Sequence, residues 1–279
     1  MFSVRVDGLR KVYKGGVVAL DDVSFAVKAG DAVAIIGPSG AGKTTLFRAL
    51  TRTIPLDGGR IELDGVDLYA AGYLKLNSVR KKIGLIYQNH NLVPQLTALH
   101  NAGMGAVGRR STLGTLKDLM FGVSNADKAA IEGALDHVGL IDKVGAKAAA
   151  LSGGEQQRVA IARLLIQDPA IILADEPAAS VDPASASTIM EIFTRLNREE
   201  EKTVICNLHD IALAKRYFKR VLGISAGRLV FDESPDELTE GILDEIYLGA
   251  RENTSESRDG RVCNERLARE GFGGIVREQ

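Results

Sequence analysis

The chain has 279 residues and a mass of 29.8 kDa, enough for one large domain or about two of ordinary size. Its content of 45% hydrophobic and 25% charged residues is normal for a globular protein and argues against a disordered chain. The formal net charge of −1 provides no overall attraction to nucleic acid, and no apolar run approaches the ~18 residues of a membrane-spanning helix.

Strand patterns dominate the N-terminal part of the chain. Apolar and polar residues alternate over 23–27, and a continuous apolar run over 32–36 is typical of a buried strand. A glycine-rich loop and a helical stretch over 44–51 follow. Strand and turn signals over 58–65 then predict a hairpin.

The pattern changes over about 89–165, where Leu and Ala at helical spacing predict a helical insert. Strand patterns return over 171–174, 204–206 and 221–224. Between the first two of these we predict a helix with Asp182 as its N-cap and a proline at its first position. Strands that alternate with helices predict an α/β fold with a mainly parallel sheet.

The glycine-rich loop over 37–44 reads Gly-Pro-Ser-Gly-Ala-Gly-Lys-Thr and fits the phosphate-binding pattern G-x-x-x-x-G-K-[ST]. It joins a buried strand to a helix, so its N–H groups and the positive end of the helix can face phosphate oxygens. Lys43 can reach the β and γ phosphates, and the Thr44 hydroxyl can ligate Mg²⁺. We therefore predict nucleotide contacts from Gly37, Pro38, Ser39, Gly40, Ala41, Gly42, Lys43, Thr44 and Thr45.

A second motif is the apolar strand over 171–174, which ends in Asp175 and Glu176. Beside a phosphate-binding loop, Asp175 suits a residue that holds Mg²⁺, and Glu176 can orient and deprotonate an attacking water. The alternative is that the two carboxylates only cap a helix.

The third motif, Leu-Ser-Gly-Gly-Glu over 151–155, comes directly before a predicted helix. Ser152, Gly153 and Gly154 offer backbone N–H groups to an anion at the positive end of that helix. Two phosphate-binding helix ends far apart in one chain are explained if two copies bring them together across a dimer interface. An ordinary capping turn is the alternative.

These motifs, in this order, resemble the ATP-binding subunits of ABC transporters over about residues 2–250. The resemblance implies an ABC ATPase of the P-loop NTPase class, an α/β core with a helical insert subdomain over about 89–165 and an antiparallel β region. We expect residues 1–250 to form the ATPase domain and 251–279 to form a loosely ordered C-terminal tail. ATP and Mg²⁺ are the expected cofactors.

Further roles are implied by the resemblance alone. Tyr13 lies where the family has an adenine-stacking aromatic residue, although it can also be an ordinary strand tyrosine. Gln88 matches the glutamine that contacts Mg²⁺, and Asp182 matches a residue that acts across the dimer. His209 matches the switch histidine, with a core histidine as the alternative. The expected catalytic residues are thus Lys43, Glu176 and His209, and the expected Mg²⁺ ligands are Thr44, Gln88 and Asp175.

Segments 91–93, 101–110 and 207–209 further resemble the ATPases of phosphonate importers. The expected function is a translocase: ATP hydrolysis by a head-to-tail homodimer, peripheral on the cytoplasmic face of the cell membrane, that energises phosphonate uptake. Its partners would be transmembrane permease subunits and, indirectly, a substrate-binding protein, with no nucleic acid.

Asp210 and Gln95 depart from the phosphonate pattern and leave the cargo open. The alternatives are the same ATPase serving phosphite, methionine or lipoprotein transport, and an ATPase associated with a carbon–phosphorus lyase. A small-molecule P-loop kinase is a third alternative. The turn over 151–155 argues against it, because a kinase needs no second phosphate-binding turn.

Overall fold

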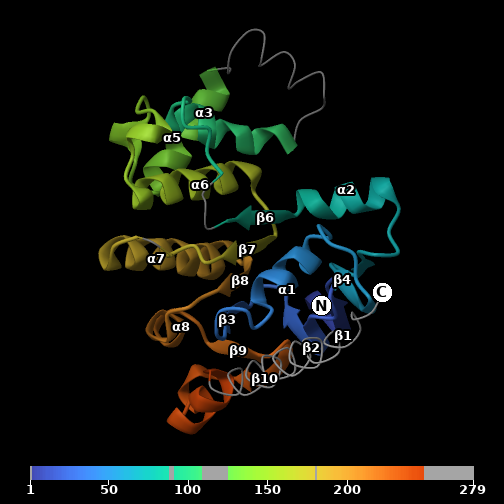
Figure 1. Ribbon diagram of the computed structural model, residues 1–279. Coiled ribbons are helices and arrows are strands. Elements are labelled where there is room, and N and C mark those ends of the chain that lie inside the picture. The colour runs from blue at the N-terminus through green and yellow to red at the C-terminus, as the bar shows by residue number, and fades with distance from the viewer. Residues whose placement is uncertain (1, 88–90, 109–124, 180, 248–279) are drawn as a thin grey trace, which may run out of the picture.

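The protein is described from a computed structural model that covers residues 2–87, 91–108, 125–179 and 181–247 (Figure 1). A six-stranded sheet lies at its centre, in the order β10-β9-β3-β8-β7-β6. Its strands are β3 (Ala32–Ile36), β6 (Ile83–Ile86), β7 (Ile171–Asp175), β8 (Thr203–Asn207), β9 (Arg220–Ser225) and β10 (Arg228–Glu233). Every pair is parallel except β9 with β10. The residues that follow β3, β7 and β8 therefore meet at one edge of the sheet.

A second sheet is antiparallel, in the order β2-β1-β4-β5. Its strands are β1 (Phe2–Val12), β2 (Val18–Lys28), β4 (Gly58–Leu63) and β5 (Val66–Asp67). The turn between β9 and β10 joins it to the central sheet, where the Asp21 N–H donates to the Gly227 carbonyl at 2.9 Å. The antiparallel region and the mainly parallel sheet agree with the predicted fold class.

The helices lie on both sides of the central sheet and in a layer beyond it (Figure 1). They are α1 (Lys43–Leu50), α2 (Tyr73–Lys81), α3 (Ala98–Gly103), α5 (Asn125–His137), α6 (Gly153–Gln167), α7 (Pro183–Glu200) and α8 (Ile211–Tyr217), with short 3-10 turns at Met104–Gly108, Ile141–Lys143, Ala148–Ala150 and Pro235–Glu237. A last helical stretch covers 240–247. Among the described residues, no helix combines the length and the apolar character that crossing a bilayer requires.

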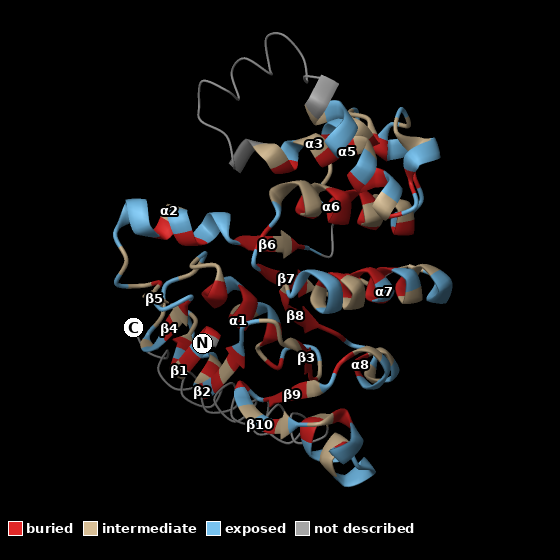
Figure 2. Cartoon of the chain, turned by 180° about the vertical axis from the view of Figure 1, so that it is seen from behind, coloured by how far each residue is buried: buried red, intermediate tan, exposed pale blue. Residues whose placement is uncertain are grey.

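The two faces of the central sheet belong to different cores because strand side chains alternate in direction. Figure 2 shows that the central strands are largely buried. Val33 and Ile35 pack with α1 and the antiparallel sheet. Ala34 and Ile36 pack with α6, α7 and the helical layer of α3 and α5. The sheet is thereby buried on both faces, which explains its nearly continuous apolar strands.

The helical layer falls within the stretch predicted to be helical. Its boundaries at about 89 and 165, and the extent of the ATPase domain over 1–250, remain predictions. The predicted tail, 251–279, lies outside the described residues, as does Gln88.

Candidate nucleotide-binding site

The phosphate-binding loop joins the end of β3 to the start of α1, and close packing requires two of its glycines, Gly37 and Gly42. A Cβ on Gly37 would overlap the carbonyl oxygen of Ile224, and one on Gly42 would overlap that of Ala19. Gly42 also has a φ of 106°, which favours glycine. No side chain caps the N-terminus of α1, so its first N–H groups face the loop without a side-chain acceptor.

Lys43 is buried at the start of α1, with 4% of its surface exposed. Its ammonium group donates to the carbonyl oxygens of Gly37 at 2.6 Å and Pro38 at 2.9 Å. Burial lowers the pKa of Lys43, and the nearby charges of Glu176 and Asp175 oppose that shift. The buried cation therefore lies within electrostatic reach of both carboxylates.

Asp175 ends β7, and its carboxylate accepts a hydrogen bond from the Asn207 side-chain amide at 2.6 Å. Burial raises the pKa of Asp175, and the charge of Glu176 adds to the increase, while the bond from Asn207 and the charge of Lys43 oppose it. A cation bound beside Asp175 would favour its ionised form in the same way as Lys43 does.

Glu176 lies directly after β7, in a left-handed backbone conformation with a φ of 53°. Its N–H donates to the Asn207 carbonyl at 3.1 Å, and its carboxylate lies 2.6 Å from Nε2 of His209. A left-handed glutamate costs free energy, on the order of 1 kcal/mol, that the surrounding contacts must supply. The fold thus holds the Glu176 carboxylate in a set direction, against His209.

The loop and the Glu176–His209 pair share one hollow of about 150 Å³. It is lined by Ala19, Ser39, Gly40, Gly42, Lys43, Thr44, Thr45, Glu176 and His209. Tyr13 lies next to it, with its hydroxyl 3.4 Å from Oγ1 of Thr45. The ammonium group of Lys11 lies 5.7 Å from the Tyr13 ring centroid. Residues from four distant parts of the sequence therefore meet at the edge of the sheet where β3, β7 and β8 end.

The turn over 151–155 is not part of this hollow. Ser152 and Gly153 are exposed, and the turn opens α6 in the helical layer. The Ser152 hydroxyl accepts from the Glu155 N–H at 3.3 Å, and the Glu155 carboxylate accepts from the Ser152 N–H at 2.8 Å. Asp182 likewise caps α7, accepting from the Ser185 N–H at 3.0 Å as predicted. Within one chain, neither Ser152 nor Asp182 lines the hollow beside Lys43.

Asn207 is a site residue that the sequence pattern did not assign a role. It is fully buried at the end of β8, where its side-chain amide donates to the Asp175 carboxylate and its main-chain carbonyl accepts from the Glu176 N–H. The available signal was a polar residue closing an apolar strand two positions before His209. It thus links the carboxylate of Asp175 and the backbone of Glu176 to the end of β8, two residues before His209.

The residues beside the loop fit Mg²⁺ bound together with a nucleotide. No cluster of three or more His, Cys, Asp or Glu side chains that could hold a metal occurs among the described residues. Mg²⁺ is commonly bound through one or two carboxylates plus substrate phosphates and water, so such a cluster is not required. The half-buried carboxylate of Asp175 and the hydroxyl of Thr44 are hard oxygen donors of the required kind.

Comparison with known proteins assigns the family. The model of the ABC transporter family matches residues 20–179. The chain belongs to this family and is one of its ATP-binding subunits. It is 40% identical to the phosphonates import ATP-binding protein PhnC of Lactiplantibacillus plantarum over 90% of this chain and 97% of that protein. The protein of the same name from Chromohalobacter salexigens is 42% identical over 90% and 91% of the two chains.

Solved structures confirm the fold. A dimeric ATP-binding cassette in a post-hydrolysis state, bound to ADP and Pi, matches with a TM-score of 0.73 and 32% identity, covering 83% of this chain and 98% of that one. The ADP conformation of an ATP-binding cassette of an ABC transporter matches with a TM-score of 0.74 and 26% identity, covering 88% and 96%. The predicted P-loop ATPase core is thereby confirmed.

Proposed function

We propose that this chain hydrolyses ATP to energise phosphonate uptake by an ABC importer. The observation that carries the ATPase part is the hollow that combines the phosphate-binding loop with the hydrogen-bonded Glu176–His209 pair. The cargo rests on the identity of about 40% to phosphonate import ATP-binding proteins across nine-tenths of the chain.

The loop residues 37–45 would bind the ATP phosphates. The first N–H groups of α1 lack a side-chain cap, and Lys43 supplies a buried positive charge. To reach a phosphate, the Lys43 ammonium must exchange at least one of its bonds to the loop carbonyls. Tyr13, whose hydroxyl lies 3.4 Å from Oγ1 of Thr45, would contact the adenine.

Glu176 would act as the general base on the attacking water, and His209 would orient it. Nε2 of His209 is 2.6 Å from the Glu176 carboxylate and so holds that carboxylate in one direction. Thr44 and Asp175, together with Gln88, would hold Mg²⁺, which neutralises charge on the phosphates when bound. Asn207 would hold the Asp175 carboxylate and the Glu176 backbone in fixed positions at the end of the sheet.

Two copies would pair head to tail, with Ser152, Gly153 and Gly154 of one copy facing the ATP of the other. The turn supports this because Ser152 and Gly153 are exposed and the turn lies outside the hollow of its own chain. Asp182 would act near the same interface. The dimer would lie on the cytoplasmic face of the membrane against transmembrane permease subunits, which receive cargo from a substrate-binding protein.

Reconstitution tests the cargo. We expect ATP hydrolysis by this chain, assembled with its permease and binding protein, to rise when the binding protein carries an alkylphosphonate. Methionine, phosphite and sulfate are the comparison ligands. Stimulation by methionine or phosphite alone would contradict the cargo while leaving the ATPase intact. Phosphate transfer to a small-molecule acceptor, rather than to water, would contradict the ATPase itself.

A further inference from the structure

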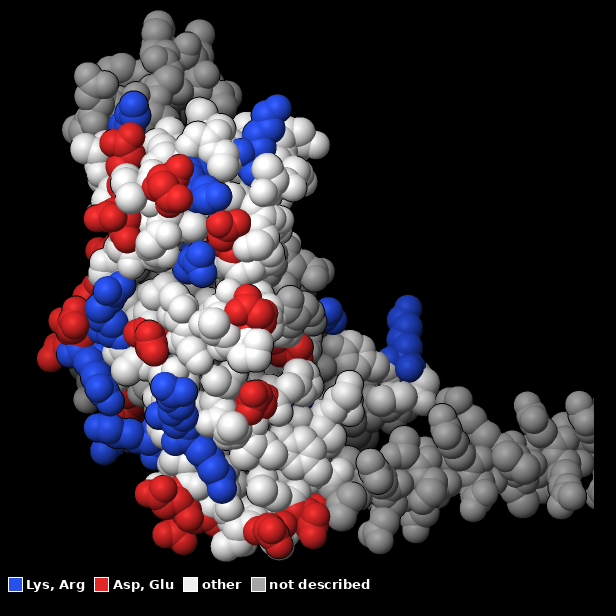
Figure 3. All heavy atoms as spheres, turned by 90° about the vertical axis from the view of Figure 1, so that its left-hand side faces the viewer, with Lys and Arg blue, Asp and Glu red and all other residues white. Residues whose placement is uncertain are grey.

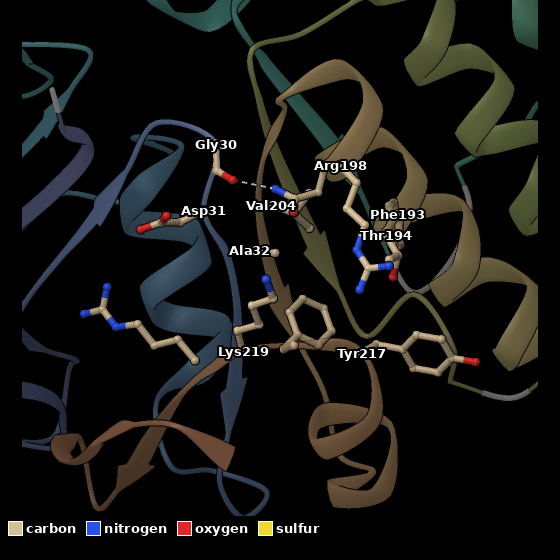
Figure 4. A pocket seen from close by; sticks show the side chains of 12 residues that line it. Gly30, Asp31, Ala32, Phe193, Thr194, Arg198, Val204, Tyr217 and Lys219 are labelled. Carbon is tan, nitrogen blue, oxygen red and sulfur yellow. Dashed lines mark hydrogen bonds between the residues drawn. The ribbon is translucent and has the colours of Figure 1, made fainter. Parts of the chain in front are cut away.

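A cavity of about 340 Å³ lies at the edge of the central sheet opposite to the nucleotide hollow. It is formed where β3, β8 and β9 begin, between the C-terminal half of α7 and the turn that joins α8 to β9 (Figure 4). Its walls include Ala32, Phe193, Arg198, Val204, Phe218 and Lys219. We name this feature the α7–β9 cavity. Its volume lies within the ~300–1,000 Å³ of small-molecule sites, toward the lower limit.

The inner wall of the α7–β9 cavity is apolar and held in place. Phe193, Val204 and Phe218 are all buried and belong to the core on this face of the sheet. Asn197 fixes the adjoining backbone, because its amide donates to the carbonyl of Gly30 at 2.7 Å and to that of Lys202 at 2.8 Å. The wall is therefore a preformed apolar surface, and the hydrogen bonds of Asn197 hold the backbone next to it in place.

The mouth of the cavity is positively charged. Arg198 and Lys219 are exposed, and both side chains extend toward the hollow from different walls (Figure 4). Within the described part of the chain, neither forms an ion pair. Asp31, the acidic residue of the lining, points away from the hollow (Figure 4) and accepts instead from the Lys28 N–H.

No carboxylate of the described residues that line the cavity forms an ion pair with Arg198 or Lys219. Arg220, also in the lining, already donates to Asp232 through Nε and Nη2 and to the Ala26 carbonyl through Nη1. Figure 3 shows several Lys and Arg side chains on the middle part of this face, with Asp and Glu side chains beside them. A neighbouring hollow shares Arg198 and Tyr217 with the cavity and adds Glu191, Glu199 and Arg216. The hydroxyl oxygen of Tyr217 is buried and has no hydrogen-bond partner among the described residues.

We propose that the α7–β9 cavity binds a small organic anion with an aromatic or branched apolar body. Its carboxylate or phosphonate group would be held by Arg198 and Lys219, and its body would pack against Phe193, Val204 and Phe218. The combination carries the argument: free cations alone bind any anion, whereas a buried apolar wall behind them selects an anion with a hydrophobic part. The site is separate from the nucleotide hollow, because β3 and β8 run between the two.

Calorimetric titration of the full chain with benzoate and phenylphosphonate tests the site. Saturating ADP is present throughout, so that binding at the phosphate-binding loop does not contribute. We expect one molecule of either acid to bind per chain. Benzamide keeps the ring of benzoate without the charge, and inorganic phosphate keeps a charge without the ring. Both should bind at least about tenfold more weakly, since each lacks one half of the recognition.

Two variants locate the binding. Arg198→Gln and Lys219→Gln should each weaken benzoate binding by about tenfold, the typical effect of losing one charge-assisted hydrogen bond. Both residues are exposed at the rim, so melting without ligand and ADP affinity should stay unchanged. Lys75→Gln, an exposed lysine on α2, is the matched control and should bind benzoate as the wild type does.

Three results would overturn the proposal. The first is that neither acid binds at millimolar concentration. The second is that benzamide or inorganic phosphate binds as tightly as the acids. The third is that the double Arg198→Gln, Lys219→Gln variant binds benzoate with unchanged affinity, which would place the acid elsewhere on the molecule.

Discussion

Two helix N-termini in this protein differ in whether side chains accept hydrogen bonds from their first N–H groups. At α1 no side chain caps the helix, and the loop before it is built from glycines that packing requires. At α6 the Ser152 hydroxyl and the Glu155 carboxylate form a reciprocal capping box. The first N–H groups of a helix need hydrogen-bond acceptors. At α6 the capping box supplies most of these acceptors, whereas at α1 a ligand has to supply them.

The surroundings of the two termini differ in the same sense. α1 starts in a hollow with the buried Lys43, and Glu176 and His209 line the same space. At the α6 terminus Ser152 and Gly153 are exposed and Gly154 is buried, Glu155 pairs with Lys143 at 3.8 Å, and neither Glu176 nor His209 lines the same space. This difference supports the proposal that the first terminus binds the phosphates of ATP in its own chain, whereas the second would complete a site in the partner copy.

The largest expected effect is on chemistry beside α1. Glu176→Gln keeps the size of the side chain but removes the base, and loss of a general base typically slows a reaction by ~10²–10⁴-fold. ATP hydrolysis should fall by that factor, while ATP affinity stays close to the wild type because Lys43 and the loop are intact. Phosphate release and nucleotide binding, measured on the same preparation, check both halves.

The matched control is the same exchange at the other terminus, Glu155→Gln. It should leave hydrolysis within a few-fold of the wild type. Wild-type turnover by Glu176→Gln, or an equal loss from Glu155→Gln, would contradict the division of labour between the two helix ends.

The next effect concerns the proposed sharing of sites between copies. Ser152→Arg blocks the exposed turn, and Lys43→Ala removes the buried cation, so neither variant alone should pair in the presence of ATP. Mixed together, they form a dimer with one intact composite site and one site broken twice. Placing Glu176→Gln in both chains prevents ATP consumption during the measurement.

Size-exclusion chromatography with ATP should then show several-fold more dimer in the mixture than in either variant alone. A mixture that pairs no more than the sum of its components would contradict the head-to-tail arrangement. In that case the nucleotide site would consist of the hollow beside α1 in a single chain.

A smaller effect is expected where the helical layer meets the sheet. The Arg195 guanidinium of α7 donates to the His137 carbonyl at the end of α5 at 2.7 Å. Arg195→Met keeps the apolar stem and removes this bond, which should cost about 1–3 kcal/mol of unfolding free energy in urea. Arg198→Met, one turn along on the exposed side of α7, is the control and should change stability by less than ~0.5 kcal/mol. Equal losses from both would show that the bond does not hold the layers together.

The smallest effect is a pH dependence at α6. The hydrogen bond from the Ser152 N–H holds the pKa of Glu155 below its ordinary value. The ionised cap therefore stabilises the fold above the ordinary glutamate pKa, and this contribution disappears as pH falls through the lowered value. Glu155→Gln should reduce stability by about 0.5–1 kcal/mol at neutral pH, since a cap contributes that much, and should match the wild type in acid. A difference that persists unchanged below pH ~3 would exclude the charge as its cause.

The phosphate-binding loop, the strand before it and the helix after it could be predicted because each depends on a pattern of neighbouring residues. The same holds for the cap of α7 by Asp182 and for the strand that carries Asp175. For Ser152 the sequence was compatible with two interpretations, an anion-binding turn and a helix cap. The structure contains the cap, whose Ser-x-x-Glu spacing was visible beforehand.

Features that depend on distant segments could not be predicted. The left-handed backbone of Glu176 has no local signal, because glutamate rarely adopts it. The roles of Asn207 follow from β8 lying beside β7, and strand order is not encoded in the pattern of either strand. The α7–β9 cavity could not be predicted from the sequence either, since its lining residues come from four separate stretches, 30–32, 193–198, 204 and 217–220.

The position of β3 sets a constraint on how the protein is made. This strand of 32–36 is central, and both of its partners, β8 and β9, begin at residue 203 or later. A ribosome adding ~5–20 residues per second would need roughly 10–30 s to extend the chain from the end of β3 to the start of β8. During that time an apolar strand would have two unpaired edges, which is a template for wrong pairing. Synthesis that pauses before residue 203 should therefore favour aggregation or chaperone capture, even though the finished sheet leaves β3 fully enclosed.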